Sequence, residues 1–480
     1  MHVHIFVNGN SYKPCKGESA LKRSARSLTR RQMLAGSLGL GLAAARHGRA
    51  ATGPLPHIVF LLADDLGYAD LSCYGRSFST PRIDSLAGAG ALFTQAYASS
   101  SVCSATRTAL ITGREPGRLR VGLDEPLAFE HEATIGLPPE VPTLPSLLRK
   151  LGYRTSLFGK WHLGLPPKFG PLKSGYDRFF GMYGGYSFYF GHGRDDPSPI
   201  IDQERILTDH GYLTDLLAQK AIEELEFARR ESRPVFLSLH FNAVHWPWEG
   251  PLDRARSMQI ENPVHRDGGS IATYRAMLES LDANVGRVLA ALDALDLAGD
   301  TIVVFTSDNG GERFSDVWPL TGMKGELLEG GIRVPVLVRW PGRIGAGLRT
   351  DQLAVTTDWL PTLLAAAGGA PAPNYPTDGE NLLPVLTGAT TPHPRTLYWR
   401  YKANEQAAVR DGRWKYLKLG GREHLFDVET DPRERAELRA AHPEQFERLK
   451  ELYAAWSKQM LPYPADARSY DVHTGTADRY

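Results

Sequence analysis

Cysteine is scarce in this chain of 480 residues, which contains three. So few thiols do not indicate a disulfide framework. The His and Cys residues do not cluster as zinc ligands do, and no Gly-rich segment after a strand has the spacing of a phosphate-binding loop. We find no internal repeat or low-complexity tract. The sequence therefore argues against a disulfide scaffold, a zinc protein, a phosphate-loop nucleotide-binding protein and a repeat protein.

Long apolar segments are also missing from the N-terminal region. The apolar run at 33–45 has 13 residues, too few to span a bilayer as a helix. It follows Arg30 and Arg31 and precedes small residues that end at 51, a pattern typical of a twin-arginine signal peptide. We therefore expect residues 1–51 to be such a signal, read by the Tat export machinery. The mature protein would be periplasmic or secreted, with no stable membrane anchor. A disordered basic tail is the alternative.

Outside that segment acidic residues outnumber basic ones, 53 to 46. Residues 1–51 carry nine Lys and Arg against Glu18 alone, a net +8, whereas the whole chain has a net charge of +1. The remaining residues therefore have a net charge of −7. An acidic domain is poorly suited to binding the phosphate backbone of DNA or RNA, so we expect no nucleic-acid partner.

Short β-rich runs alternate with helical patterns from residue 56 to about 369, as in a doubly wound α/β sheet flanked by helices. The length predicts one large domain with a smaller one appended. We assign 52–370 to the large domain. The expected strands are 57–63, 155–158, 235–241, 301–306 and 334–339, and the expected helices are 81–89, 105–112, 143–151, 212–230 and 274–297. Residues 165–200 and 246–270 are expected to be long loops.

Residues 371–480 form the predicted C-terminal subdomain, which begins within a Pro-rich stretch at 370–376. Four short β patterns and one helical pattern follow, which predicts a small antiparallel sheet with a helix. The strands are expected at 396–400, 406–409, 414–417 and 424–426, and the helix at 443–458.

Polar side chains follow two of the predicted strands. Asp64 and Asp65 come after the first strand, and Asp308 and Asn309 after the strand at 301–306. Ligands collect at the carboxyl ends of strands in such sheets, and these oxygen donors suit a hard divalent cation such as calcium. A helix cap or turn is the alternative for the Asp pair alone.

Cys103 lies in residues 101–107 (SVCSATR), at the predicted start of a helix and four positions before Arg107. A helix N-terminus and a basic residue stabilise an anion, so this setting suits a nucleophile. A buried small apolar side chain is the alternative, and it is the reading we favour for Cys73, which has no such setting.

These motifs resemble those of the sulfatase family, and they occur in the family's order from about residue 56 to 457. After the Asp pair come the Cys103 motif with its trailing Thr-Gly-Arg, residues 159–164 (GKWHLG), the His245 segment, residues 307–310 (SDNG) and residues 322–326 (GMKGE). Ala105 stands where the family usually has proline. The resemblance implies an alkaline-phosphatase-like mixed sheet.

The resemblance also implies that a maturation enzyme converts Cys103 to formylglycine, and that the enzyme tolerates Ala105. Each chain would bind one Ca²⁺. The implied ligands of that ion are Asp64, Asp65, Cys103 in its modified form, Asp308 and Asn309.

Five basic residues match family positions, and the resemblance implies their roles. Arg107 would hold the modified residue and the metal environment, while Lys160 and Lys324 would bind sulfate oxygens. His162 would act as base on the remaining hydroxyl of the hydrated aldehyde, and His245 with Lys324 would protonate the leaving oxygen.

The implied activity is hydrolysis of aryl or carbohydrate sulfate monoesters. A phosphonate or phosphate monoester hydrolase is the nearest alternative, because tetrahedral anions at sulfur and phosphorus make similar demands. A non-catalytic sulfoglycan-binding protein would follow if Cys103 stayed a thiol. Aromatic residues in 183–192 and 246–249 would either line a substrate pocket or pack in the core.

Overall fold

A computed structural model describes residues 55–75, 77–193, 198–261 and 268–471. All of them fall in one unit, residues 53–480. The signal peptide expected at 1–51 lies outside the described residues and stays a prediction, as does the division of the mature chain at 370.

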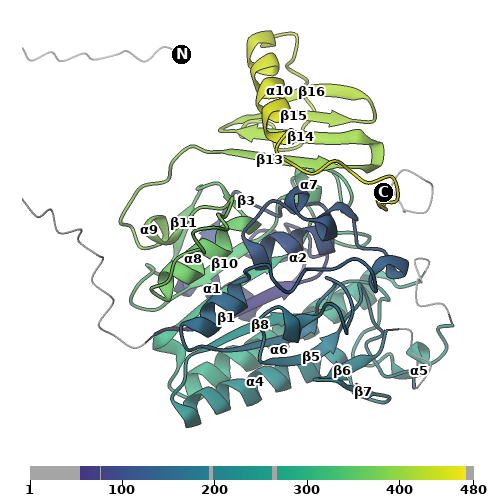
Figure 1. Cartoon of the computed structure of the whole chain (residues 1–480), viewed down its shortest axis with the longest axis vertical. Coiled ribbons are helices and arrows are strands. Elements are labelled where there is room, and N and C mark those ends of the chain that lie inside the picture. Colours follow the sequence, from purple (N-terminus) through teal and green to yellow (C-terminus); the bar gives the residue numbers. More distant parts are fainter. Residues whose placement is uncertain (1–54, 76, 194–197, 262–267, 472–480) are drawn as a thin grey trace, which may run out of the picture. The chain divides into compact units, whose positions relative to one another are not determined.

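The described chain is built on a ten-stranded mixed sheet with the order β11-β2-β10-β9-β1-β8-β4-β5-β6-β7 (Figure 1). At its centre β1 (His57–Ala63) lies parallel to both β8 (Val235–His240) and β9 (Thr301–Ser307). Strand β4 (Arg154–Lys160) continues the parallel part, and β10 (Val336–Arg339) runs antiparallel to β9. All five predicted strands are therefore present.

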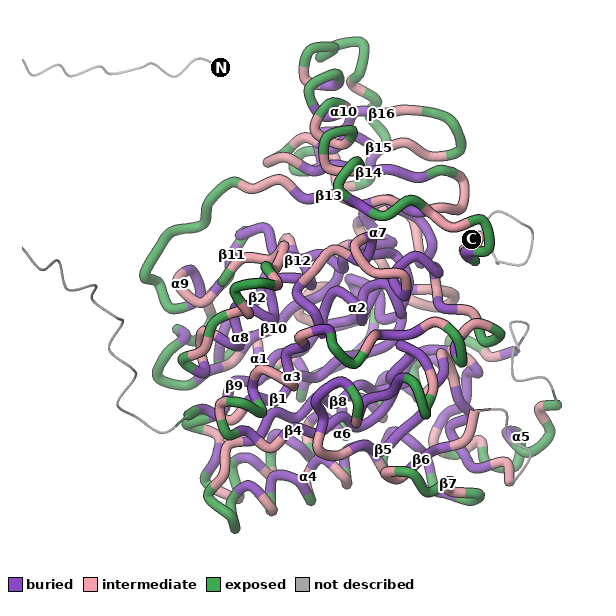
Figure 2. Tube along the Cα trace, viewed as in Figure 1, coloured by how far each residue is buried: buried purple, intermediate pink, exposed green. Residues whose placement is uncertain are grey.

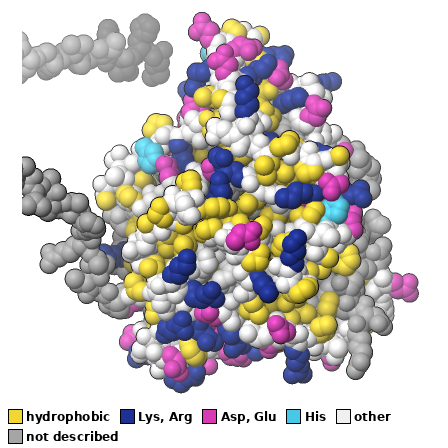
Figure 3. Space-filling view, viewed as in Figure 1, with side chains coloured by type: hydrophobic (Ala, Val, Ile, Leu, Met, Phe, Trp, Pro, Cys, Tyr) yellow, Lys and Arg dark blue, Asp and Glu magenta, His cyan; other side chains and the backbone are white. Residues whose placement is uncertain are grey.

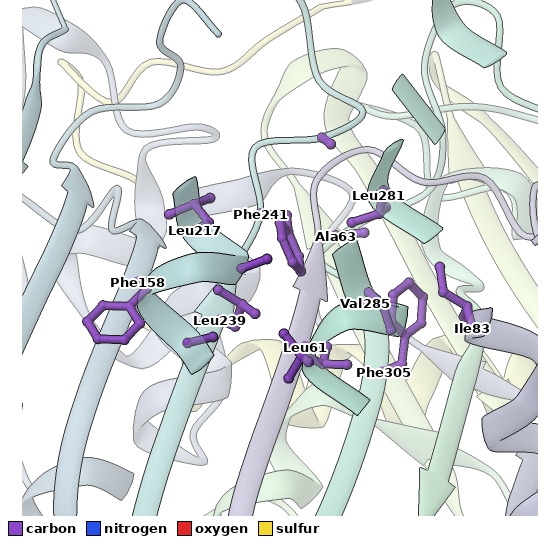
Figure 4. Packing of buried hydrophobic residues seen from close by; sticks show 14 of the residues in the cluster. Leu61, Ala63, Ile83, Phe158, Leu217, Leu239, Phe241, Leu281, Val285 and Phe305 are labelled. Atoms are coloured by element: carbon purple, nitrogen blue, oxygen red, sulfur yellow. The ribbon is translucent and has the colours of Figure 1, made fainter. Parts of the chain in front are cut away.

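Helices cover both faces of this sheet because β1 is apolar on both faces. Val59, Leu61 and Ala63 belong to one buried cluster, and the alternate residues Ile58 and Phe60 to another. Figure 4 shows the first cluster, where Leu61 and Ala63 lie near side chains from α4 and α6. The first cluster includes residues of α1 (Pro81–Ala89), α4 (Leu213–Glu231) and α6 (Ile271–Ala294), and the second includes residues of α2 (Cys103–Thr112), α3 (Leu144–Lys150) and α8 (Trp359–Ala366).

The predicted loop at 165–200 is wrong in one part, because it contains strand β5 (Arg178–Met182), which pairs in parallel with β4. Gly181 in this strand has φ +151°, and a Cβ there would lie 2.0 Å from the carbonyl oxygen of Gly159. Glycine is required by this close approach of two backbones, so the glycines that suggested a loop partly reflect strand packing. The predicted loop at 246–270 likewise contains a short helix, α5 (Arg254–Ser257).

Several short elements were not predicted, because segments of two to four residues, and the eight-residue α8, carry little periodic signal. The other unpredicted elements are β2 (Ala91–Phe93), β3 (Ala96–Tyr97), β6 (Ile200–Asp202), β7 (Arg205–Leu207), α7 (Glu329–Ile332), β11 (Leu348–Thr350), β12 (Ala354–Val355) and α9 (Leu383–Leu386).

The C-terminal residues form the predicted antiparallel sheet and helix. The sheet consists of β13 (Thr396–Tyr401), β14 (Gln406–Asp411), β15 (Trp414–Leu419) and β16 (Arg422–Asp427), in that order. Helix α10 (Pro443–Ser457) packs Phe446 and Leu449 against this sheet. Lys415 of β15 lies 2.9 Å from the Glu329 carboxylate of α7, and both side chains are buried. A buried ion pair thus links the small sheet to the large domain.

Buried residues concentrate along the central strands, whereas the loops of the small sheet are exposed (Figure 2). On the face shown in Figure 3, Lys and Arg side chains are interspersed with Asp and Glu, so positive charge forms no continuous patch there. None of the helices in the described ranges combines the length and apolar character needed to cross a bilayer.

Candidate active site

Four of the five residues predicted to bind a cation lie together at the carboxyl edge of the central sheet. Strands β1 and β9 are parallel neighbours that stay in register to their last residues, so both end at the same edge. Asp64 and Asp65 follow β1, and Asp308 and Asn309 follow β9. All four are almost completely buried. The sheet therefore brings together side chains that are more than 240 residues apart in the sequence.

The geometry of this group fits a divalent cation. Donor atoms of Asp64, Asp65, Cys103 and His245 all lie within 4.8 Å of one another. The Oδ1 atoms of Asp64 and Asn309 are buried, and no described residue donates a hydrogen bond to either. Buried oxygens without donors are costly unless a cation satisfies them. His245 joins this group, which the sequence did not predict.

Two buried cations oppose the carboxylates on one side. Arg107 donates from Nε and Nη2 to Asp308 Oδ2, over 3.1 and 2.8 Å. Lys160 Nζ donates to Asp64 Oδ2 over 2.7 Å. Burial and the neighbouring Asp308 nevertheless raise the pKa of Asp64 to about 8, against the lowering effect of Lys160 and Arg107. Asp64 is thus short of positive charge, which a divalent cation would supply.

Lys324 holds the second aspartate from the other side. Its Nζ donates to Asp65 Oδ2 over 2.7 Å. Burial raises the pKa of Asp65, but Lys324 and His245 together outweigh this effect, so its net pKa is lowered. Asp65 therefore stays ionised. Its φ of +60° is a sparsely populated backbone conformation for a non-glycine residue, of the kind that clusters at functional sites.

Cys103 is the first residue of α2, two positions before the predicted start of that helix. The helix begins earlier because Val102 takes the extended N-cap conformation. Burial raises the pKa of the Cys103 thiol to about 11, although Lys160 and Lys324 lower it. The thiol is therefore protonated at neutral pH, which argues against an unmodified thiolate as nucleophile.

Ala105 is the third residue of α2 and is buried against the cluster that includes Tyr97 and Val102. The first N–H groups of a helix have no intrahelical partner, so proline is tolerated in this first turn. Alanine in place of the family's proline therefore leaves the helix start intact.

His162 is fixed in one tautomer by its surroundings. Nε2 lies 3.0 Å from the carbonyl oxygen of Leu127, so Nε2 carries the proton. Nδ1 is buried, with no hydrogen-bond partner among the described residues. Burial and Lys160 hold the pKa of His162 well below its usual value. A Cβ on Gly185 would lie 2.7 Å from the ring, so only glycine fits there. His162 is thus a neutral imidazole with Nδ1 as its basic nitrogen.

His245 is also fixed, with the opposite nitrogen protonated. Nδ1 donates to the carbonyl oxygen of Trp246 over 2.5 Å, and Nε2 lies 3.6 Å from Asp65 Oδ2. Burial and Lys324 hold the pKa of His245 well below its usual value. An acid role would therefore require His245 to gain a proton when substrate is bound.

A cavity of about 530 Å³ opens beside this group. Cys103, His162, His245 and Lys324 lie on its wall, whereas Arg107 and Lys160 do not. The structure therefore divides the predicted catalytic residues into four that face the cavity and two that lie behind the carboxylates. Glu132 and residues 468–470 also line the cavity. Sequence reasoning missed them because they belong to no motif and lie in loops.

Some aromatic residues of 183–192 and 246–249 line the cavity, and others pack in the core. Tyr186 and Trp246 line the cavity, with ring centroids 4.9 Å apart. Tyr189, Phe190 and Trp248 instead belong to the buried core. One member of each segment thus faces the cavity, while its neighbours pack inside the protein.

An α/β sheet with cation ligands at its carboxyl edge and a buried Cys motif beside them is the alkaline-phosphatase-like fold. The family model described as Sulfatase matches residues 56–370, and the model described as N-sulphoglucosamine sulphohydrolase, C-terminal, matches residues 324–459. The chain belongs to the sulfatase family and is a hydrolase of sulfate esters. Family membership implies a formylglycine residue and a divalent metal ion.

Named relatives agree with this assignment. Arylsulfatase A of Homo sapiens is 35% identical over 430 residues, covering 82% of this chain and 80% of its own. N-acetylgalactosamine-6-sulfatase of Canis lupus familiaris is 32% identical over 402 residues, covering 78% of this chain and 74% of its own. The structure of Ps i-CgsB in complex with k-i-k-neocarrahexaose is 30% identical with a TM-score of 0.78, covering 88% of this chain and 96% of its own.

Proposed function

We propose that this enzyme hydrolyses carbohydrate sulfate monoesters, and aryl sulfates as simpler substrates, through a formylglycine at position 103 and a bound Ca²⁺. The observation that carries the proposal is the position of Cys103. It lies on the cavity wall and within 4.8 Å of the cation donors. Two relatives support a sugar substrate: one is named for N-acetylgalactosamine 6-sulfate, and a solved structure holds a neocarrahexaose.

Calcium is the ion that this donor set favours. Asp64, Asp65, Asp308 and Asn309 offer oxygen atoms, and carboxylate and amide oxygens from irregular positions suit Ca²⁺ better than the strict octahedron of Mg²⁺. The ion would supply positive charge for the nucleophile and the sulfate group. Lys160 would hold Asp64 in place for the ion through the hydrogen bond from its Nζ to Oδ2.

A formylglycine at position 103 would supply a hydrated aldehyde, one hydroxyl of which attacks sulfur. The chain's own residues then handle protons and charge. Lys324 faces the cavity and would bind a sulfate oxygen, and Arg107 would hold Asp308 in place through its two hydrogen bonds. His245 would deliver a proton to the leaving oxygen when its bond to sulfur breaks. His162 would later take, at Nδ1, the proton of the second hydroxyl at position 103 when sulfate is released.

A formylglycine-generating maturation enzyme is part of this proposal. Every residue of α2 is buried in the folded chain, so a modifying enzyme cannot reach Cys103 without exposing the segment. Conversion would precede folding of α2. Conversion of Cys103 in this chain would show that the maturation enzyme does not need the proline that the family usually has at position 105.

A phosphonate or phosphate monoester hydrolase remains the competing activity. The phosphonate monoester hydrolase of Agrobacterium radiobacter shares the fold, with a TM-score of 0.61 at 21% identity. The test compares kcat/KM for the sulfate and phosphate esters of one phenol, with Cys103→Ala as the inactive control. Faster hydrolysis of the sulfate supports our proposal, and faster hydrolysis of the phosphate contradicts it.

We also propose that the protein is exported by the Tat route to the periplasm or beyond. The support is the sequence pattern around Arg30 and Arg31, since the receptor reads the arginine pair and not charge alone. Arg30→Lys with Arg31→Lys should leave the precursor in the cytoplasm, as measured by cell fractionation. Undiminished export of this double variant would contradict the proposal.

A further inference from the structure

Glu132 is a buried carboxylate in the wall of the active-site cavity. Its side chain is 2% exposed, and it lies beside His162, with Oε1 3.9 Å from Nε2. No described residue donates a hydrogen bond to its Oε2, which is buried. Within the described chain, no Lys or Arg lies within 4.0 Å of either oxygen. The carboxylate therefore has acceptor capacity that the described residues do not use.

The backbone that carries this carboxylate is fixed by hydrogen bonds. The carbonyl oxygen of Glu132 accepts a hydrogen bond from the Leu165 N–H over 2.8 Å, and its own N–H donates to Phe129. The preceding loop is tied to α2, because Leu127 N–H donates to Ser104 Oγ over 2.7 Å. Glu132 is thus held in a fixed relation to the helix that begins at Cys103.

The space next to the carboxylate is kept open by glycine. A Cβ on Gly184 would lie 3.5 Å from each oxygen of Glu132, so a larger side chain there would cover them. A buried carboxylate without donors is unfavourable, and its cost falls when a ligand supplies an O–H or N–H group. Burial also raises the pKa of Glu132 to about 7, with Lys160 acting in the opposite direction.

The same cavity offers an apolar surface. Tyr186 and Trp246 lie on its wall with their rings in contact, and Phe129 lies on the wall with its side chain 63% exposed. Aromatic faces pack against the apolar C–H face of a ring while polar groups at its edge find hydrogen-bond partners. An apolar wall combined with one buried acceptor is suited to a pyranose ring.

We propose that Glu132 is a specificity-determining residue, whose carboxylate accepts a hydrogen bond from a hydroxyl or N–H group on the sugar ring that carries the sulfate. This inference rests on the proposed hydrolysis of sulfate esters. It adds that the site selects substrates whose leaving group is a sugar with such a donor. Glu132 takes no part in the attack on sulfur. Its contribution is to bind and orient the sugar, so a substrate without such a donor does not benefit from it.

The test compares kcat/KM of Glu132→Leu and Glu132→Gln on two substrates, nitrophenyl sulfate and N-acetylgalactosamine 6-sulfate. For the sugar sulfate we expect a loss of about 100-fold or more in Glu132→Leu, and about 10-fold in Glu132→Gln, which keeps one acceptor oxygen. On nitrophenyl sulfate, which has no donor, the loss should stay below about threefold. Glu140→Gln is the control, because Glu140 is exposed and does not line the cavity.

Equal losses on both substrates would overturn the proposal and show that Glu132 acts by positioning His162. No loss on either substrate would also overturn it. A wild-type enzyme that cleaves nitrophenyl sulfate but neither N-acetylgalactosamine 6-sulfate nor galactose 6-sulfate contradicts the sugar subsite while leaving sulfatase activity intact. Failure on all three sulfates would instead contradict the proposed function.

A second comparison serves if Glu132→Leu does not fold. Deoxy analogues of the sugar sulfate, each lacking one ring hydroxyl, are tested on the wild type and on Glu132→Gln. The analogue that lacks the partner of Glu132 should lose about 10-fold or more with the wild type and less with the variant, since the two changes remove one interaction. Additive losses for every analogue would overturn the proposal.

Discussion

His162 donates its Nε2 proton to the carbonyl oxygen of Leu127 over 3.0 Å, and this bond leaves Nδ1 as the basic nitrogen of the ring. The low pKa of the buried imidazole keeps that nitrogen unprotonated at neutral pH. A base of this kind suits the release of sulfate after the alcohol has left. The order of these two events leads to a kinetic prediction.

His162→Ala should slow sulfate release without preventing the first cleavage. With nitrophenyl sulfate we expect a burst of about one nitrophenol per active site, followed by steady-state turnover reduced by about 100-fold or more. Rapid-mixing absorbance measurements would detect the burst. A slow, linear release of nitrophenol from the first turnover would place His162 in the cleavage step instead.

His245 and Lys160 should respond differently to the leaving group. If His245 protonates the leaving oxygen, His245→Ala should slow a sugar sulfate far more than nitrophenyl sulfate, because a phenolate leaves readily without a proton. Lys160→Ala should slow both substrates about equally, because Lys160 acts through Asp64, to which it donates over 2.7 Å, and not on the leaving oxygen. Equal losses in His245→Ala would shift the acid role to Lys324.

Asp308→Asn should lower metal content and activity together. The substitution keeps the size of the side chain but removes a charge that Arg107 and the cation would share. We expect the calcium content of the purified protein to fall by at least half, with added Ca²⁺ restoring part of the activity. Asp378→Asn is the control, since Asp378 pairs with Arg118 outside the cavity. Full activity in the metal-free wild type would exclude the ion from the mechanism.

Glu125 should make folding stability depend on pH. Its buried carboxylate accepts hydrogen bonds from the Tyr463 hydroxyl over 2.6 Å and the Lys402 N–H over 2.7 Å. Burial raises its pKa from 4.5 to about 7, against the effect of these hydrogen bonds. The folded state therefore holds this proton more tightly than the unfolded state does. The resulting stability is fully present below pH 4.5 and is lost as the pH rises to about 7.

The neutral variant Glu125→Gln should lack this pH dependence. Between pH 4.5 and pH 8, the free energy of unfolding of the wild type relative to the variant should fall by up to about 3 kcal/mol. Denaturant titrations of both proteins would measure it, with the exposed Glu130→Gln as the control. A constant difference across this range would show that folding does not raise the pKa of Glu125.

The sequence predicted the strands and helices that have a clear pattern of apolar residues, and the polar residues that follow strand ends. The five central strands and the helix at Pro81–Ala89 are present because continuous apolar runs rich in β-branched residues, or helical patterns, leave few alternatives. Strand β5 was missed because Gly181, which the close approach of β4 requires, resembles a loop residue. The spacing of apolar residues does not reveal that a glycine is needed where two strands pack closely.

The candidate site shows a similar division. Asp64 and Asp308 could be predicted to meet, because parallel neighbouring strands end at one edge. Glu132 could not, because its burial beside His162 depends on the path of a loop without regular structure. The tautomers of His162 and His245 depend on carbonyl groups that no side-chain pattern encodes. Motifs thus identify reacting groups, whereas loops that shape the cavity need the structure.

The central claim is that position 103 carries formylglycine in the active enzyme. Mass spectrometry of the peptide containing residue 103, from a preparation whose turnover has been measured, tests it most directly. We expect the mass of an aldehyde in place of the thiol, in a fraction of molecules that matches the active fraction, with Cys103→Ala inactive but folded. A fully active preparation in which this peptide has the mass of unmodified cysteine would contradict the account.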